Sequence, residues 1–492
     1  MMAALAFADV SHLSPGASRA FVSTDPTIVE ARAAYKAGAF TRAAMLLSSA
    51  EVTDAAARDE LTEVIRRMRR EYNLDRAGLL IKLRESIPDV TDADLDRWMA
   101  AEQVQYRTID GQIWFFRREP GHILLFCKEA IDRRDAHTAL KPGASAPDSW
   151  TLEDHLKEII ASAANSATPE VLPLKTRVKY TLTVNANPRG AKSGSLLRVW
   201  LPFPQVYGRQ RDAKLLRSNP DGATVAPPAI DGDPVTGVPQ RTVYLERKID
   251  DPSQPAKFEI EFEFITSAFY PKLDDTRPKP GASAPDRSRI DSSYLSQRPP
   301  HIVFTPELKA KANEIVGAET NPLIKARKIF IWLDENLRWT PEEEYCVIPN
   351  LSMHGLTRGK GDCGVASMTF ITLCRIVGVP ARWQSGWTTN PVGWNMHDWS
   401  EIYIEPWGWI PVDASYGRQK SDDPAVRDFY FGHTDSHRLI VSLDYGRELS
   451  PAKQSFRSEP LDFQRGEVEL DGRNLYFDEW DYEIEFEREA VR

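Results

Sequence analysis

Residues 359–382 read GKGDCGVASMTFITLCRIVGVPAR, a helical pattern that opens on a cysteine. From Cys363 onward, apolar side chains recur at three- and four-residue intervals, which is typical of a helix packed on a core. Asp362 is a suitable N-cap residue, and Gly378 followed by Pro380 is a stop signal. The pattern therefore predicts a helix that begins at Cys363.

A thiol at the start of a helix differs chemically from one further along it. The helix dipole and the unpaired N–H groups of the first turn favour thiolate, so we expect a lowered pKa for Cys363. Cys374 lies about 16 Å further along the axis, at 1.5 Å per residue, and cannot pair with it. Cys374 is predicted to be a buried apolar filler.

Length and composition set the general class of the protein. The 492 residues are too many for one core and predict about three domains. A net charge of −9 argues against nucleic-acid partners. No apolar run approaches the ~20 residues of a membrane span, and four scattered cysteines match no disulfide framework or zinc pattern. We expect no membrane span, no metal and no cofactor; oligomeric state is left open.

The N-terminus, MMAALAFADV, carries a short apolar stretch. Ala6-Phe7-Ala8 resembles a signal-peptidase site, but no basic region precedes it. Two interpretations stay open. The stretch is the remnant of an export signal to the periplasm or cell envelope, or it is the ordinary terminus of a cytoplasmic protein.

Residues 1–140 are predicted to form an α-rich N-terminal region. Residues 31–47 have the small–large spacing of one tetratricopeptide-like helix pair, without a second copy. A helix capped by Thr91 or Asp92 then precedes two strands joined around Asp110-Gly111, a strong hairpin signal. Helix and hairpin together are similar to a winged helix. Because acids and bases are mixed here, we expect a packing module, not a DNA-binding one.

The phrase KPGASAPD occurs twice, at 141–148 and 279–286, and predicts surface linkers. Between the copies lie strand-like segments, two of which alternate strictly between apolar and polar residues. They predict an antiparallel β-sandwich over 165–275. The four segments are RVKYTLTV (177–184), LLRVWLPFP (196–204), RTVYLERKI (241–249) and KFEIEFEFI (257–265).

The last domain is predicted over 300–492, with helices at 306–316 and 322–337 before the cysteine helix. WSEIYIEP and GWIPVDAS then alternate on either side of a Pro-Trp-Gly turn and predict a hairpin. A thiol nucleophile needs a base, and the base needs a carboxylate to orient it. Cys363, His397 and Asp413 supply these groups. A metal site is the alternative, but the spacing matches no zinc pattern.

Strand geometry raises a difficulty for this triad. If the hairpin closes tightly at 406–408, Asp413 lies about 13 Å along the strand from the position opposite His397. A looser or bulged turn is then required. The neighbouring Asp398 is expected to point away from the thiol, because successive strand residues face opposite sides.

The motifs GDCG, LCRIVGVPAR, HDW and GWIPVD resemble those of the transglutaminase-like superfamily of papain-like thiol enzymes. The resemblance covers about residues 160–492 and extends to uncharacterised, often exported bacterial proteins. It implies an α+β fold in which a papain-like catalytic domain follows a β-sandwich and an α-rich region. It also implies that Cys363 is the nucleophile, His397 the base and Asp413 the acid that orients it.

The resemblance leaves the oxyanion donor open. Thr357 stands where papain-type enzymes carry a glutamine, and the upstream tryptophan of animal transglutaminases corresponds to Trp339, with Tyr345 as second choice. The backbone N–H of Cys363 is the more secure donor, because a helix N-terminus points it at the developing charge. Separately, Trp387 and Trp394 are placed on a loop before His397 and are predicted to line a substrate groove.

The predicted function is thiol-dependent cleavage of an amide or peptide bond through an acyl-enzyme. Acyl transfer to an amine uses the same residues and remains an alternative, as does a non-catalytic binding or scaffold protein. Hydrolysis is favoured because water is always present and nothing in the sequence marks an amine site. The expected partner is a protein, peptide or other amide-containing substrate.

Overall fold

The computed structural model describes residues 23–139, 150–229, 238–276 and 291–491, which fall into two units. The first unit takes residues 23–139 together with 340–348. The second takes the other described residues and holds both the sandwich and the cysteine helix. The mixture of helices with mainly antiparallel sheets confirms the predicted α+β class.

The first unit is α-rich, with one small antiparallel sheet in the order β1-β3-β2. Thr91 caps α6 through a capping box, and Asp110 and Gly111 adopt positive φ angles at the turn between β2 and β3. The predicted helix and hairpin are therefore present. The elements are α2 (Pro26–Lys36), α3 (Phe40–Leu47), α4 (Ala55–Glu71), β1 (Tyr72–Leu74), α5 (Arg76–Arg84), α6 (Asp92–Ala100), β2 (Tyr106–Ile109), β3 (Gln112–Phe116), α7 (Glu119–Phe126), α8 (Lys128–Ala139) and the 3₁₀ turn η4 (Tyr345–Val347).

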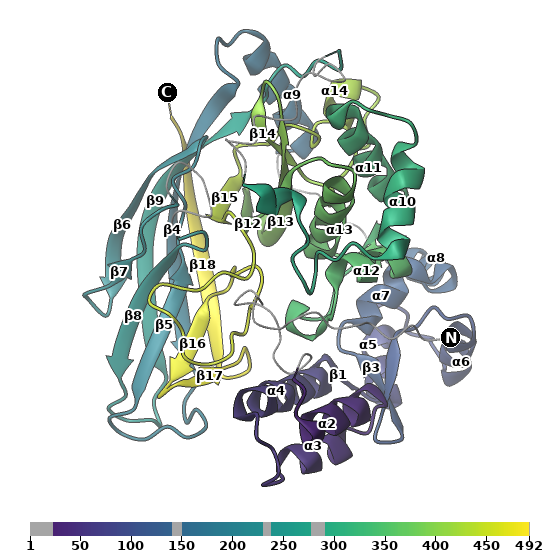
Figure 1. Cartoon of the computed structure of the whole chain (residues 1–492), viewed down its shortest axis with the longest axis vertical. Helices are drawn as coiled ribbons and strands as arrows, with labels where there is room; N and C mark the ends of the chain where they lie inside the picture. The colour runs from purple at the N-terminus through teal and green to yellow at the C-terminus, as the bar shows by residue number, and fades with distance from the viewer. Residues whose placement is uncertain (1–22, 140–149, 230–237, 277–290, 492) are drawn as a thin grey trace. The chain divides into compact units, whose positions relative to one another are not determined.

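The second unit contains a sandwich of two antiparallel sheets, seen on the left of Figure 1. One sheet has the order β18-β4-β9-β6 and the other β17-β16-β5-β8-β7. Helix α9 (Leu152–Ala164) precedes them. The strands are β4 (Glu170–Val184), β5 (Leu196–Pro202), β6 (Gln210–Asn219), β7 (Thr224–Val225), β8 (Thr242–Lys248), β9 (Ala256–Phe269), β16 (Glu467–Leu470), β17 (Arg473–Leu475) and β18 (Trp480–Ala490).

The alternating segments form the sandwich core as their pattern indicates. Along 178–184 of β4 and 258–264 of β9, every second side chain is buried in one cluster, and these residues are Val178, Tyr180, Leu182, Val184, Phe258, Ile260, Phe262 and Phe264. Period-two burial of this kind follows from the pleat of a strand.

The sandwich also recruits strands from the far end of the chain, which the sequence division did not include. β18 pairs with β4 from Trp480↔Val184 to Ala490↔Leu174, and β16 pairs with β5. The structure therefore differs from the expected limits of 165–275 for the sandwich and 300–492 for the catalytic domain. Residues 340–348 also differ, since they cluster with the first unit.

The rest of the second unit is a four-stranded antiparallel sheet, in the order β14-β13-β12-β15, with helices packed beside it. In Figure 1 this sheet lies between the sandwich and the green helices α10, α11 and α13. The elements are η3 (Ser292–Leu295), α10 (Pro306–Val316), α11 (Pro322–Asn336), β10 (Arg338–Trp339), α12 (Leu351–Arg358), β11 (Lys360–Gly361), α13 (Cys363–Ile376), β12 (Ala381–Asn390), β13 (Gly393–Ile404), β14 (Gly408–Val412), α14 (Pro424–Arg427) and β15 (Arg438–Ser442).

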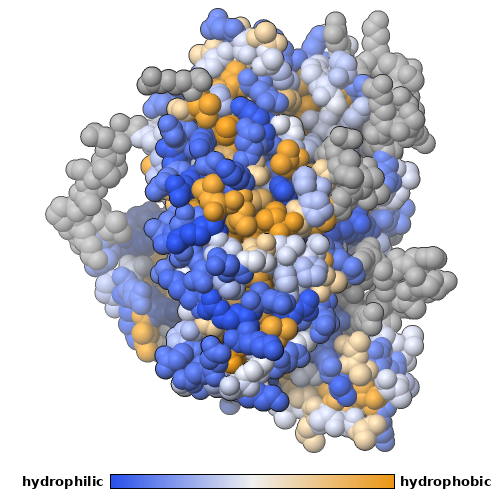
Figure 2. Space-filling model, turned by 90° about the vertical axis from the view of Figure 1, so that its left-hand side faces the viewer, coloured by the Kyte–Doolittle hydropathy of each residue, from blue (hydrophilic) through white to orange (hydrophobic). Residues whose placement is uncertain are grey.

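The sandwich carries paired charges on its surface. Arg217 binds both Glu259 and Glu261, and Lys179 binds Glu485. Figure 2, which views the molecule from the sandwich side, shows a mostly hydrophilic surface with smaller hydrophobic patches. No helix among the described residues is long and apolar enough to cross a membrane.

Two earlier interpretations concern residues outside the described ranges. These are the signal-peptidase-like Ala6-Phe7-Ala8 and the two KPGASAPD segments, at 141–148 and 279–286. They stay predictions.

The backbones of β12 and β15 approach closely at Gly386, which generates the first testable prediction. A Cβ atom on Gly386 would lie 1.8 Å from the carbonyl oxygen of Leu439, an overlap that only backbone movement relieves. We expect Gly386→Ala to lower the free energy of unfolding by about 1–3 kcal/mol or more, as overpacking does. Thermal unfolding measures the loss.

Gly393→Ala is the matched control on the partner strand. A Cβ atom there meets nothing within 4 Å, and Gly393 is exposed. Equal melting temperatures for the two variants would contradict the close approach of β12 and β15.

Candidate active site

Cys363 is the first residue of α13, as the sequence predicts. Asp362 caps the helix by accepting a hydrogen bond from the N–H of Val365 at 3.2 Å. Gly361 lies against Val365, where a Cβ atom would come within 2.4 Å of a methyl group, so glycine is required just before the cap. The half-buried thiol is thus held at the helix N-terminus by tight local packing.

His397 lies on β13, and its Nε2 is 2.7 Å from Oδ2 of Asp413. The turn between β13 and β14 is responsible for this contact, because Ile404 pairs with Gly408 and leaves three residues, 405–407, in the turn. Continuing that register places Asp413 opposite Trp399, two residues from His397 and on the same face. The separation along the strand is then about 7 Å, which two side chains can bridge. The 13 Å expected from a turn at 406–408 is too long.

Asp413 is buried and held from several directions. Its Oδ2 also accepts from Nη1 of Arg438 at 2.7 Å, and its Oδ1 accepts from the N–H groups of Ser415 and Tyr416. Burial alone would raise the pKa of Asp413, but His397 and Arg438 outweigh it and hold that pKa below its usual range. The carboxylate is therefore ionised where His397 needs a counter-charge.

Arg438, at the start of β15, was not singled out from the sequence. Its buried guanidinium binds Asp435 as well as Asp413, and it stacks over the rings of Tyr416 and Tyr430. No local sequence signal marks it, because its partners come from other parts of the chain. It supplies the positive charge that offsets two buried carboxylates.

Aromatic side chains fix the imidazole of His397. The ring of Trp399 lies parallel to it, with centroids 5.8 Å apart, and the ring of Tyr416 meets it edge-on at 4.9 Å. Since Nε2 is engaged by Asp413, Nδ1 is the nitrogen left to exchange a proton with another group.

Asp398 contradicts the expectation that it faces away from the thiol. The Sγ of Cys363 donates to Oδ2 of Asp398 at 3.4 Å. Oδ1 of the same carboxylate accepts from Nε2 of Gln464 at 2.7 Å. Alternation along β13 directs the side chains of Asp398 and His397 to opposite faces, as expected. The side-chain hydrogen bond recorded for the thiol is nevertheless to Asp398, while the one recorded for the imidazole of His397 is to Asp413. The structure thus joins His397 to Asp413 by a hydrogen bond and shows none between His397 and Cys363.

The pKa of Cys363 also differs from the expectation. Burial raises it well above its ordinary value, and the charges of Asp398 and Asp362 add to the increase. These effects act against the helix N-terminus, whose N–H groups favour thiolate. Cys374 is fully buried, as predicted, and burial raises its pKa too.

The structure places the predicted oxyanion donors and the predicted groove residues in different surroundings. Trp339 is 50% exposed and pairs through its backbone with Gly361, two residues before Cys363. Tyr345 belongs to the first unit. Trp387 is 0% exposed and donates to the carbonyl of Gln464, so it cannot line a groove.

Trp394 packs its ring against Trp387 and against Phe486 of the sandwich. Both tryptophans lie on strands, β12 and β13, and not on a loop. The predicted groove role is corrected for Trp387, which is buried where the four-stranded sheet meets the sandwich. Trp394 is half-buried, and its groove role stays a prediction.

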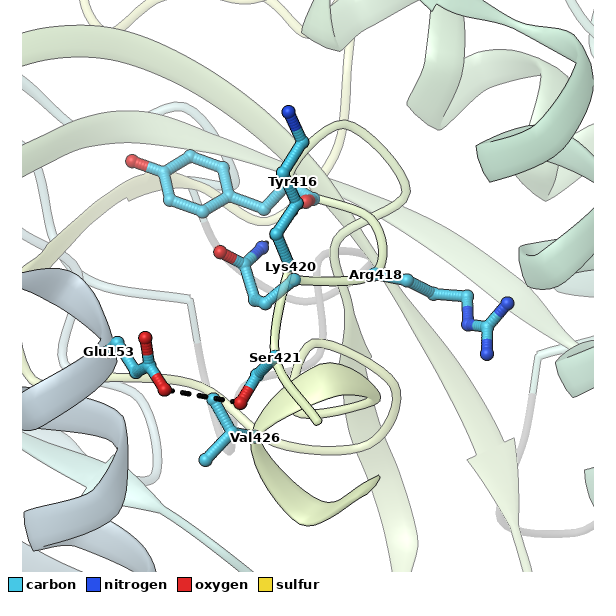
Figure 3. A pocket seen from close by; sticks show the side chains of 7 residues that line it. Glu153, Tyr416, Arg418, Lys420, Ser421 and Val426 are labelled. Atoms are coloured by element: carbon cyan, nitrogen blue, oxygen red, sulfur yellow. Dashed lines mark hydrogen bonds between the residues drawn. The ribbon is translucent and has the colours of Figure 1, made fainter. Parts of the chain in front are cut away.

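A cavity of about 370 Å³ opens beside Tyr416, whose ring contacts His397. Figure 3 shows the hydrogen bond from Ser421 to Glu153 at this cavity, and Arg418 is also among the residues that line it. Gln419, Lys420 and Val426 complete the lining. Among the described residues, no group of three or more His, Cys, Asp or Glu side chains could hold a metal ion.

Comparison with known proteins defines the class of this core. Residues 309–414 match the family model of the transglutaminase-like superfamily, as the sequence motifs predicted. This segment holds α11, α12, the cysteine helix, β12, β13 and β14, and ends just past Asp413. The second unit thus contains a transglutaminase-like core, which is a fold of thiol enzymes.

Individual relatives are distant. An uncharacterized protein of Haemophilus influenzae is 26% identical over 194 residues, which are 32% of this chain and 52% of that protein. The chain thus spans about half the length of this curated relative. A candidate cysteine protease from Cytophaga hutchinsonii is 14% identical, with 66% of this chain and 92% of that chain covered and a TM-score of 0.42. The periplasmic domain of TgpA from Pseudomonas aeruginosa is 15% identical, with 56% and 95% covered and a TM-score of 0.24.

The buried ion pairs of Arg438 generate the second prediction. Because the pKa of Asp413 is lowered in the folded protein, its ionisation stabilises the fold above the unfolded-state pKa, ~3.9, and this stabilisation is lost as the pH falls below it. Arg438→Gln leaves Asp413 and Asp435 without that cation, so the pKa of Asp413 rises. We expect a loss of about 3–5 kcal/mol at neutral pH and acid unfolding that begins at a higher pH.

Urea unfolding between pH 4 and pH 8 measures both effects. Arg217→Gln is the control, because its ion pairs with Glu259 and Glu261 lie at the surface, and it should unfold like the parent protein. An Arg438→Gln variant with parental stability at every pH would show that the buried pairs contribute nothing.

Proposed function

We propose that this protein is a cysteine hydrolase that cleaves an amide or peptide bond through an acyl-enzyme on Cys363. The observation that carries the proposal is the buried contact between His397 Nε2 and Asp413 Oδ2, at 2.7 Å, in a transglutaminase-like core. A base oriented by an ionised carboxylate is what a thiol nucleophile requires.

The proposed reaction begins with proton transfer from the Cys363 thiol to Nδ1 of His397. The sulfur then forms a bond to the substrate carbonyl carbon, and the developing oxyanion is stabilised by the backbone N–H of Cys363 at the helix start. Collapse of the tetrahedral intermediate breaks the C–N bond, and His397 returns the proton to the departing amine. A thioester and a free amine result.

Deacylation uses the same base. His397 takes a proton from water, the hydroxide oxygen attacks the thioester carbonyl, and the sulfur leaves to regain its proton. Asp413 stabilises the imidazolium in both halves of the reaction, and Arg438 holds Asp413 in place. Tyr416 connects His397 to the neighbouring cavity, which we propose holds part of the substrate.

Acyl transfer to an amine differs only in the second nucleophile and is the second candidate. Incubation with labelled peptides and glutamine-containing peptides, with and without a primary amine, separates the two by mass spectrometry. Hydrolysis gives the acid product, and transfer gives an amine adduct. A binding or scaffold protein would give neither product and no thioester on Cys363.

The roles within the triad generate the third prediction. Cys363→Ala should abolish turnover and leave the fold intact, since a small residue is tolerated at a helix start. His397→Ala should be nearly as damaging. Asp413→Asn should lower kcat by several orders of magnitude, because an amide cannot stabilise the imidazolium. Rates are measured on whichever substrate the screen identifies, with melting temperatures alongside.

Cys374→Ala is the matched control, because it removes the other thiol of the same helix. Cys374 is buried in the core, so this variant should lose stability and keep its turnover number. Full activity of Cys363→Ala, or an inactive but folded Cys374→Ala, would overturn the assignment of the nucleophile.

A further inference from the structure

The carboxylate of Asp398 is the nearest charged partner recorded for the thiol, at 3.4 Å. We propose that Asp398 is a positioning residue that keeps Cys363 protonated in the resting protein, so that thiolate forms only as His397 takes the proton during attack. This inference rests on the proposed function for its consequence in catalysis, but its physical content, the state of the thiol, does not depend on any substrate.

Asp398 is buried next to the thiol, so its charge acts strongly on the sulfur. The residue is 1% exposed, so its charge is weakly screened by solvent. Its two oxygens have separate partners, since Oδ2 accepts from the thiol and Oδ1 accepts from Gln464. A carboxylate facing sulfur opposes a negative charge on that sulfur and accepts a hydrogen bond from its protonated form.

Gln464 holds this carboxylate rigidly. The glutamine is 4% exposed, and its Nε2 donates both to Asp398 Oδ1 and to the carbonyl oxygen of His397, at 2.7 and 2.8 Å. Its own backbone N–H donates to Glu459, and its carbonyl accepts from Trp387. One amide group thus fixes the backbone of the proposed base and the side chain of the residue that opposes thiolate.

Other charges around the start of α13 must be counted with Asp398. Asp362, on the N-cap, adds a second negative charge and raises the thiol pKa in the same direction. The elements packed against α13 carry further charged or titratable groups, among them His354 and Arg358 on α12, Lys360 on β11, Arg382 on β12, and His397 and Glu401 on β13. Helices α10 and α11, which also pack on α13, carry lysines and acids of their own. The Glu459–Arg465 pair lies beside Gln464.

The catalytic consequence is a neutral starting state. The S–H bond breaks as the proton moves to Nδ1 of His397 and the S–C bond forms, so no free thiolate accumulates between turnovers. Such a thiol resists small electrophiles and oxidants, which react with thiolate. Proteins with a standing thiolate–imidazolium pair are instead reactive at rest.

The test is the pH dependence of alkylation of the full-length protein by iodoacetamide, with each cysteine followed by peptide mass spectrometry. For the parent protein we expect Cys363 to titrate above the ordinary cysteine pKa of ~8.5. Asp398→Asn keeps the size of the side chain and removes its charge. It should move the midpoint down and speed alkylation of Cys363 at pH 7 by about tenfold or more.

Two further variants show whether the change in alkylation is specific to Asp398. Asp362→Asn, which retains a capping side chain, removes the other nearby charge and should speed alkylation less than Asp398→Asn. Asp481→Asn, at an exposed site on β18, should leave the profile unchanged. Labelling of Cys374 reports loss of the fold, because that thiol is fully buried.

Each outcome decides the proposal. A folded Asp398→Asn variant with an unchanged or higher midpoint overturns it. If Asp398→Asn exposes Cys374, the parent profile still decides, because a midpoint at or below ~8.5 for Cys363 contradicts a thiol held protonated. Alkylation needs no turnover, so a failure here is distinct from a failure to find hydrolysis.

Discussion

The guanidinium of Arg438 forms two buried ion pairs that constrain how the strands of the second unit pack. Arg438 on β15 binds Asp413, which follows β14, and Asp435, in the segment before β15. A buried charge is costly unless it is paired and hydrogen-bonded, so an arrangement of these strands that separated Arg438 from Asp413 and Asp435 would leave buried charges unpaired. The arrangement in the structure brings Asp413 to His397 on β13. The proposed base is thus oriented as a consequence of burying one arginine.

The C-terminal segment supplies the second constraint. After β15 the chain returns through residues 459–466. There the carbonyl oxygen of Asp462 accepts hydrogen bonds from the hydroxyls of Ser385 and Ser442. The side-chain amide of Gln464 donates to the carbonyl of His397 and to the carboxylate of Asp398. It then forms β16, β17 and β18 within the sandwich. Trp387 and Trp394 pack on the same sandwich, so the four-stranded sheet and the sandwich share one core. This explains why they form one unit and not two domains.

Local features of this architecture were predictable from sequence, and features set by distant contacts were not. The start of α13, its Asp362 cap and the alternation in β4 and β9 depend on neighbouring residues, and all match the structure. The pairing of β18 with β4 joins residues about 300 positions apart, and period-two patterning alone cannot choose a partner strand. Trp387 was misplaced for the same reason, since its burial comes from the sandwich.

The state of the thiol shows how tertiary contacts reverse a local rule. A helix N-terminus favours thiolate by partial charges within one turn, and the sequence shows beside it only the opposing charge of the adjacent Asp362. Asp398 is 35 positions away along the chain, and its full charge at 3.4 Å acts in a buried setting. A full charge at contact distance exceeds the half-charge of a dipole. The same helix start that should stabilise the oxyanion during attack therefore need not hold a thiolate at rest.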